Sequence, residues 1–149
     1  MSRAYNLSEQ IRSCILMLER KWDRKNLDLQ LEFDEHQVCA NEELLKQVWI
    51  NLLDNAIKFT PDGHTVQVRI SENEGSLQVA IMNTGSEISP EDQKRIFNKF
   101  YQADQSHATQ GNGVGLAVVK RIVDLHGGEV SVFSENEVTV FSVQLPKKA

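Results

Sequence analysis

Apolar and polar residues alternate with two different periods along this chain, and the change of period predicts where helices and strands lie. Within residues 1–26 the apolar residues recur at helical spacing: Ile11, Ile15, Leu18 and Trp22. Ser8 followed by the acidic Glu9 is typical of a helix start, so a lead-in helix is expected here. Residues 27–33, LDLQLEF, alternate and indicate a half-buried strand, and a short strand near Val38 is expected to pair with it.

A longer helix is predicted over residues 41–60, NEELLKQVWINLLDNAIKFT, with Asn41 as its N-cap. One side of this helix is apolar, as in ordinary core packing: Leu45, Val48, Trp49, Leu52, Leu53 and Ala56. The opposite stripe is polar but carries one strong charge: Gln47, Asn51, Asn55 and Lys58. Asparagine is a poor helix former and a good oxygen donor, so this stripe suits a hard metal ion and the polyanion it accompanies. A polar helix face without a ligand is the alternative interpretation.

Two hairpins are predicted in the second half of the chain, because residues 65–71 and 76–82 alternate, as do residues 129–134 and 138–145. The strands of each pair are separated by turn residues, Glu74-Gly75 and Glu135-Asn136. Helices interleaved with hairpins predict a single α/β sandwich domain over residues 1–149, with one mixed sheet and helices packed on one face.

Two further helices and a loop are expected between these hairpins. Ser89-Pro90-Glu91-Asp92 predicts a helix start, because proline is favoured at the first helical position, and it leads into a short helix at RIFNKF, residues 95–100. Residues 102–112 are polar without periodicity and indicate a mobile loop. Residues 113–126 predict a helix that ends at Gly127-Gly128.

Composition narrows the class of protein. The 149 residues are 40% hydrophobic and 25% charged, as in ordinary globular domains, and the net charge of −5 argues against a nucleic-acid surface. Cys14 and Cys39 are isolated and form no CxxC motif, which favours neither a zinc site nor a disulfide framework and fits a reducing compartment. Neither a signal peptide nor a membrane-spanning run is visible.

Two short motifs carry candidate chemistry. GNGVG at residues 111–115 opens a helix, and glycines at a helix start let backbone N–H groups approach phosphates, although a flexible helix entry is the alternative. The motif is neither a Walker A loop nor a Rossmann turn, because no Lys-Ser or Lys-Thr follows and no strand precedes it. Asn83-Thr84-Gly85 follows a predicted strand, where Asn83 could contact a base edge or simply make a turn.

Taken in order, these stretches resemble the catalytic and ATP-binding domain of sensor histidine kinases, within the Bergerat-fold ATPases. The sequence NLLDNAIKFTPDG is similar to the N box of that family, and NTGSEIS is similar to its G1 box. RIFNKFY is similar to the F box, and GNGVGLAVVKRIVDLHGG is similar to the G2 box. The resemblance covers nearly the whole chain and implies a Bergerat-type (GHKL) fold with ATP and Mg²⁺ as cofactors.

The resemblance also implies residue roles. Asn55, with Asn51 beside it, would bind Mg²⁺ and through it the triphosphate, and Lys58 would contact a phosphate. Phe59 would line the nucleotide, and Asn83 stands in the place of an aspartate that recognises the adenine amino group.

Further matches to the family concern its glycines, its F box and a threonine. The glycine-motif matches are Gly85, Gly111, Gly113 and Gly115, with Leu116 after them. The F-box matches, expected to pack under a lid, are Phe97, Phe100 and Tyr101. Thr139 matches a threonine beside the adenine pocket, and an ordinary strand residue is its alternative interpretation.

Three departures from the family pattern bear on nucleotide affinity. Asn83 replaces a carboxylate and would accept a hydrogen bond from the amine more weakly. Glu87 replaces a glycine and adds bulk and negative charge near the pocket mouth. Gln102 stands where an arginine often follows the F box, and no Lys or Arg lies between Lys99 and Lys120. The expected lid therefore offers no cation to a triphosphate.

The resemblance predicts a kinase domain that needs other parts. The chain has four histidines, His36, His64, His107 and His126, and none of them lies in a phosphoacceptor motif. No catalytic residue is therefore assigned within the chain. The acceptor histidine would lie on a separate dimerisation domain, and a response regulator would be the further partner. Gln47 stands where related ATP hydrolases have a water-activating glutamate, which favours transfer to histidine over hydrolysis.

Two functions remain open from the sequence. The first is the ATP-binding half of a histidine autokinase, active with its dimerisation domain. The resemblance implies a cytoplasmic segment of a membrane-bound parent, and a monomer is expected because the family dimerises through that other domain. The second is a degenerate nucleotide-binding or regulatory module that docks to a response regulator or to its own dimerisation helices. The three departures favour the second function, whereas the intact N box and glycine loop favour the first.

Overall fold

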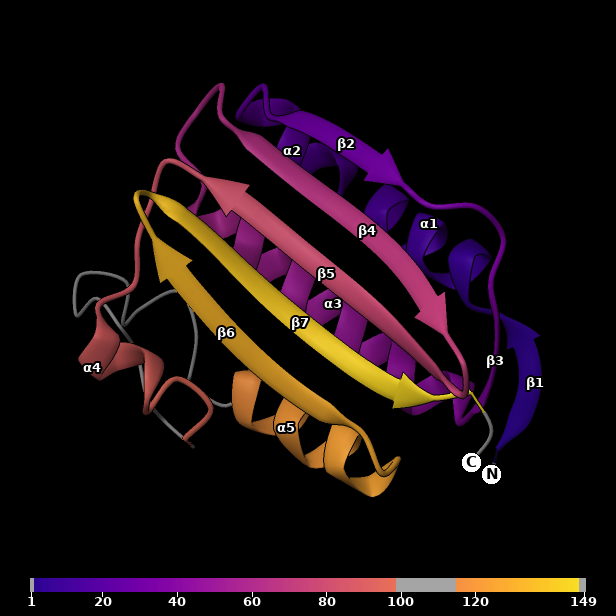
Figure 1. The fold of residues 1–149 in the computed structure, drawn as a ribbon. Helices are drawn as coiled ribbons and strands as arrows, with labels where there is room; N and C mark the ends of the chain where they lie inside the picture. Colours follow the sequence, from indigo (N-terminus) through magenta and orange to yellow (C-terminus); the bar gives the residue numbers. More distant parts are fainter. Residues whose placement is uncertain (1, 99–114, 148–149) are drawn as a thin grey trace.

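The structure is a computed structural model that describes residues 2–98 and 115–147. Its centre is a five-stranded sheet in the order β2-β4-β5-β7-β6, with the long helices on one face (Figure 1). The strands of this sheet are β2 (Asp28–Glu32), β4 (Thr65–Asn73), β5 (Ser76–Thr84), β6 (Glu129–Glu135) and β7 (Val138–Pro146). Strands β2 and β4 are parallel and the other pairs are antiparallel, so the predicted mixed sheet with helices on one face is confirmed.

The central helix is α3, Glu42–Phe59, and it crosses behind the middle strands (Figure 1). Asn41 is its N-cap, because its side-chain oxygen accepts from the amide of Leu44 at 3.0 Å, as predicted. Two longer helices flank α3 in the same layer, α1 (Leu7–Met17) and α5 (Gly115–Leu125), and shorter ones lie at α2 (Glu19–Arg24) and α4 (Pro90–Gln93). The apolar side of α3 is buried against the sheet, as its helical period predicts: Leu45, Val48, Trp49, Leu52, Leu53 and Ala56.

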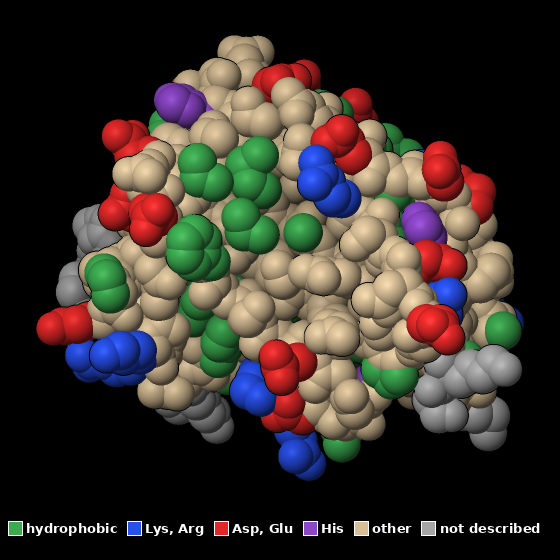
Figure 2. Space-filling model, in the orientation of Figure 1, with side chains coloured by type: hydrophobic (Ala, Val, Ile, Leu, Met, Phe, Trp, Pro, Cys, Tyr) green, Lys and Arg blue, Asp and Glu red, His purple; other side chains and the backbone are tan. Residues whose placement is uncertain are grey.

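The two faces of the sheet differ, because strand side chains alternate between them. The face under the helices is apolar and includes Val68, Ile81 and Phe141 in the core. No helix of the described residues covers the opposite face, which Figure 2 shows. Hydrophobic side chains gather near one end of that face, where the register places Phe133 beside Val140 and Val140 beside Met82.

The start of the chain differs from the prediction. Residues Arg3–Asn6 form a strand, β1, and the N-cap of α1 is Asn6, whose side chain accepts from Glu9 N at 2.9 Å. The prediction that Ser8 starts the helix is therefore wrong. Ser8 is buried, and its hydroxyl donates to Asp34 O at 2.6 Å and accepts from His36 N at 2.9 Å. The hydroxyl thus fixes a distant segment, which local sequence does not reveal.

The partner expected for residues 27–33 is also wrong. Strand β3, Gln37–Ala40, pairs antiparallel with β1 in a small separate sheet and not with β2. Strand β2 pairs in parallel with β4 instead. A period of two identifies a strand and its buried face, but it does not choose the partner.

The helix predicted at RIFNKF is wrong for the residues that the structure describes. Helix α4 begins as predicted, with Ser89 Oγ accepting from Asp92 N at 3.1 Å, but it ends at Gln93. Residues 94–98 are turns, in which Arg95 N donates to Asp92 O at 3.0 Å. Ile96 is buried in the core, so tertiary packing at this point overrides the local helical pattern. The predicted loop at residues 102–112 lies outside the described residues.

Both cysteines are free. Cys14 is buried on α1, and burial raises the pKa of its thiol to about 11. Among residues 2–98 and 115–147, no helix combines the length and the apolar character that crossing a bilayer requires.

Candidate functional site

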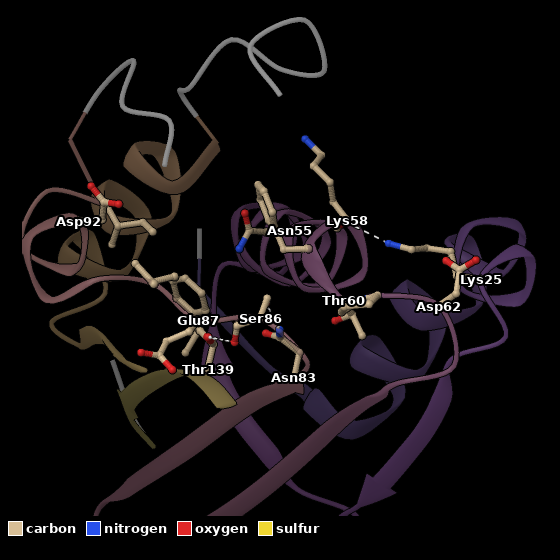
Figure 3. Close-up of a pocket in the computed structure, with 15 residues that line it drawn as sticks. Lys25, Asn55, Lys58, Thr60, Asp62, Asn83, Ser86, Glu87, Asp92 and Thr139 are labelled. Atoms are coloured by element: carbon tan, nitrogen blue, oxygen red, sulfur yellow. Dashed lines mark hydrogen bonds between the residues drawn. The ribbon is translucent and has the colours of Figure 1, made fainter. Parts of the chain in front are cut away.

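A pocket of about 570 Å³ lies between the C-terminal end of α3 and the ends of β5 and β7. Its polar lining comes from several distant segments: Lys25, Asn55, Lys58, Thr60, Asp62, Asn83, Ser86, Glu87, Asp92 and Thr139 (Figure 3). Its apolar lining is Phe59, Pro61, Ile88, Ile96 and Phe141. A concave site of this size, with apolar walls and a few polar groups, is typical of a small-molecule binding site.

Helix α3 contributes one wall of the pocket. Asn55, Lys58 and Phe59 line it, because residues three and four apart share one face of a helix. The ammonium nitrogen of Lys58 lies 6.0 Å from the centroid of the Phe59 ring. In Figure 3 the side chain of Lys58 extends away from the strand ends that carry Asn83 and Thr139, whereas Asn55 lies beside the helix. A neutral oxygen and a cation therefore share this wall.

Asn51 lies one turn earlier on α3 but is not among the residues that line the pocket. Its Nδ2 donates to the carbonyl of Gln47 at 2.8 Å, and its Oδ1 faces the first residue of α5. A Cβ added at Gly115 would lie 3.1 Å from this oxygen. The described end of the glycine motif therefore lies against the polar stripe of α3, and Gly115 permits that close approach.

The C-terminal end of α3 is capped by two side chains that the sequence analysis did not single out. Thr60 is buried, and its hydroxyl donates to Ala56 O at 2.5 Å. Lys25, from the connection before β2, donates its Nζ to Ile57 O at 2.7 Å and to Lys58 O at 3.0 Å. Desolvation lowers the pKa of Lys25, and the nearby carboxylate of Asp62 opposes that shift. No local motif identifies Lys25, because its partners lie more than thirty residues away.

The strand ends contribute the opposite wall. Asn83 on β5 and Thr139 on β7 are cross-strand partners that are 3% and 2% exposed. Asn83 Nδ2 donates to Ser86 Oγ at 3.2 Å. The Thr139 hydroxyl shares a hydrogen bond of 2.8 Å with Ser134 Oγ and donates to Ser86 O at 3.3 Å (Figure 3). The two residues therefore place buried hydrogen-bonding groups at this wall of the pocket.

Gly85 and Glu87 connect the end of β5 to the turn between β6 and β7. Gly85 has φ +89°, and a Cβ there would lie 2.8 Å from His64 Nδ1 and from Pro61 Cδ. Its amide donates to Glu137 O at 2.9 Å, and Glu87 Oε1 accepts from Glu137 N at 2.8 Å. Glu87, which was expected to add bulk and negative charge near the pocket mouth, thus also fixes this turn.

The remaining predicted residues lie beside the pocket or outside the described chain. Leu116 packs partly buried against the core, and Phe97 meets Phe141 edge-on with 6.0 Å between ring centroids; neither lines the pocket. Outside the described residues lie Phe100, Tyr101, Gln102, Gly111 and Gly113.

The described pocket offers oxygen donors that suit a hard cation. No group of three His, Cys, Asp or Glu side chains suited to a metal ion occurs in the described part of the chain. The carboxamide oxygen of Asn55 is the type of ligand that Mg²⁺ accepts when phosphates and water complete its coordination. The residues present therefore fit a magnesium ion that arrives with a phosphorylated ligand.

Comparison with known families assigns the chain to a class of protein. Residues 40–149 match the family described as histidine kinase-, DNA gyrase B- and HSP90-like ATPase. The chain belongs to this family of ATPases.

Individual relatives agree on a subgroup of that family. The sensor histidine kinase CusS of Escherichia coli O157:H7 is 35% identical over 145 residues, which are 96% of this chain and 30% of the relative. The heme sensor protein HssS of Staphylococcus aureus (strain JH9) is 35% identical over 128 residues, 85% of this chain and 28% of the relative. The chain thus spans less than a third of the length of these curated relatives.

Solved structures show the same architecture. The catalytic domain of histidine kinase ThkA superposes with a TM-score of 0.90 at 29% identity, over 99% of this chain and 97% of that domain. ThkA in complex with the response regulator TrrA matches with a TM-score of 0.84 at 28% identity, over 98% of this chain and 42% of that one. Sensor histidine kinases are transferases, and this chain corresponds to their catalytic domain.

Proposed function

We propose that this chain binds Mg-ATP and supplies the γ-phosphoryl group to a histidine on a separate dimerisation domain, in two-component signal transduction. The observation that carries the proposal is the pocket, which Asn55 and Lys58 of α3 line together with the polar residues Asn83 and Thr139 of β5 and β7. Asn55 would hold Mg²⁺ and Lys58 would contact a phosphate. Asn83 would bind the base at the opposite wall, with Thr139 beside it.

The pocket residues would act by positioning ATP for transfer of its γ-phosphoryl group. Phosphoryl transfer needs an acceptor in line with the γ-phosphate and electrostatic stabilisation, with little covalent chemistry from the ATP site. Gln47, exposed on α3, is an amide and cannot act as a general base toward water. We therefore expect transfer to histidine and negligible hydrolysis, far below about 1 s⁻¹.

The proposal is tested by titration calorimetry with a non-hydrolysable ATP analogue, with and without Mg²⁺. We expect micromolar affinity in Mg²⁺ that weakens at least about tenfold in Asn55→Ala. Gln78→Ala, on the open face of β5, is the control and should bind as the wild type does. Equal affinity in Asn55→Ala and in the control would argue against the assigned magnesium site.

A transfer experiment tests the second half of the proposal. The chain is mixed with γ-labelled ATP and a dimerisation domain that carries the phosphoacceptor histidine. We expect acid-labile label on that domain and a hydrolysis rate far below about 1 s⁻¹. Label that appears only as free phosphate would contradict the kinase assignment.

A degenerate nucleotide-binding or regulatory module is the second candidate, and Asn83 in place of an aspartate is the feature that favours it. In that case wild-type chain would show no binding in the calorimeter, and Asn83→Asp would restore it. The module would then act by docking to a response regulator or to its own dimerisation helices.

We also propose a response regulator as a partner, since the related kinase ThkA has been solved with its response regulator TrrA. A cytosolic position and a monomeric state of this chain complete the proposal. Size-exclusion chromatography with light scattering tests the monomer, and a dimer mass would contradict it.

A further inference from the structure

Asn83 has hydrogen-bonding capacity that its neighbours do not use. The residue is 3% exposed and lines the pocket. Its Nδ2 donates to Ser86 Oγ at 3.2 Å, and among the described residues no hydrogen bond to its Oδ1 is present. A buried polar atom without a partner costs free energy. The carboxamide therefore retains one acceptor and one N–H for a ligand in the pocket.

Thr139 and Glu87, which also line the pocket near Asn83, already form hydrogen bonds within the protein. The Thr139 hydroxyl is bonded to Ser134 Oγ and Ser86 O, and Glu87 Oε1 accepts from Glu137 N. A base bound at this wall would therefore find in Asn83 a group that both donates and accepts.

We propose that Asn83 makes the pocket accept 6-oxo purine nucleotides as well as 6-amino purine nucleotides. The inference rests on the proposed function, since it specifies the base at the same site. A 6-aminopurine offers an amino donor and the N1 acceptor, whereas a 6-oxopurine offers the O6 acceptor and an N1–H donor. A carboxamide matches the first edge in one orientation and the second edge after a half-turn about its terminal torsion.

Ser86 makes both orientations of the carboxamide available. Its hydroxyl accepts from Asn83 Nδ2 in the structure, and it would donate to Oδ1 after the half-turn. The reversal therefore keeps the hydrogen bond between the two side chains. A carboxylate at position 83 would only accept, so it would favour the amino group and repel O6.

Binding of Mg-ATP and Mg-inosine triphosphate is measured with wild type, Asn83→Asp and Gln78→Glu. Inosine triphosphate is the probe because it differs from ATP only in the donors and acceptors at N1 and C6. Gln78→Glu makes the same amide-to-acid change on the open face of β5 and is the matched control. Wild type should bind both nucleotides within about tenfold of each other. Asn83→Asp should shift the preference toward ATP by about tenfold, and the control should leave the ratio unchanged.

The outcomes separate this inference from the proposed function. ATP binding with inosine triphosphate weaker by more than about tenfold in wild type would overturn the inference and leave the proposed function intact. A nucleotide ratio that is the same in Asn83→Asp and in the control would also overturn it. Binding of neither nucleotide to wild type would overturn both.

Discussion

Asn83 and Thr139 lie directly opposite each other on β5 and β7, and both side chains face the pocket beneath the helices. Both residues are almost fully buried, at 3% and 2% exposure. Neither side chain is apolar, although their neighbours along the same strand faces, such as Ile81 and Phe141, belong to the core. The inward-facing side chains of the sheet are therefore apolar in the core and hydrogen-bonded polar groups at the pocket.

Thr139→Val tests what the hydroxyl contributes to this wall. We expect a loss of about 1 kcal/mol in the free energy of unfolding, because Ser134 Oγ and Ser86 O lose a buried partner. Urea denaturation measures the change. Thr65→Val is the control, since no side-chain hydrogen bond of Thr65 occurs in the described chain, and it should change stability by a few tenths of a kcal/mol. A loss of similar size in both variants would show that the network contributes little.

Gly85→Ala should destabilise the domain more than Gly75→Ala does. Both glycines have positive φ, +89° and +84°, so both substitutions strain the backbone. Only at Gly85 would the new Cβ also collide, with His64 and Pro61 at 2.8 Å, whereas nothing lies within 4 Å at Gly75. We expect about 1 kcal/mol for Gly75→Ala and at least about 2 kcal/mol for Gly85→Ala. Thermal unfolding of both variants checks the order, and equal losses would refute the steric argument.

Lys25→Met should weaken the end of α3. The variant removes the donor to Ile57 O and Lys58 O, and we expect a cost of about 1 kcal/mol in the free energy of unfolding. Lys21→Met is the control, because it removes only an exposed ion pair with Asp54 and should cost about 0.5 kcal/mol or less. Hydrogen exchange should also show faster exchange in the last turn of α3 in Lys25→Met alone. Unchanged exchange there would mean that the cap is not needed.

Glu72 should contribute a pH-dependent part of the stability. Hydrogen bonds from His36 and then Lys147 hold the pKa of this carboxyl below its usual range. The unfolded chain therefore binds the proton more readily, so the contribution is complete above the ordinary pKa of about 4.3 and is lost as pH falls through the folded value. Glu72→Gln should thus lower stability at neutral pH and match the wild type in acid.

Urea midpoints measured from neutral pH down to about pH 3 test this prediction. The control is Glu74→Gln, in the turn after β4, because Glu74 forms no ion pair among the described residues. Its stability difference from wild type should stay constant across the same range. A constant difference for Glu72→Gln as well would mean that the ion pairs do not depress the pKa enough to matter.

Local patterns were sufficient for most of the elements. The helical stripe of residues 41–60 and the cap at Asn41 predicted α3, and the two alternating pairs predicted both hairpins. Each of these features depends on residues that are close in sequence, either within about one helical turn or in two strands joined by a short loop. Hydrophobic periodicity and capping motifs detect this kind of local relationship. The same local rules failed at Ser8 and at RIFNKF. The Ser8 hydroxyl donates to the carbonyl of a residue distant in sequence, and Ile96 packs in the core.

The mixed α/β class, the polar stripe on α3 and the family resemblance follow from residue patterns along the chain. The pairing of the strands, the place of Asn55 rather than Asn51 in the described pocket, and the cap that Lys25 makes on α3 became apparent in the folded molecule. A side chain's hydrogen-bond partner and its depth in the fold depend on segments that meet only after the sheet has formed, and no spacing along the chain encodes that meeting.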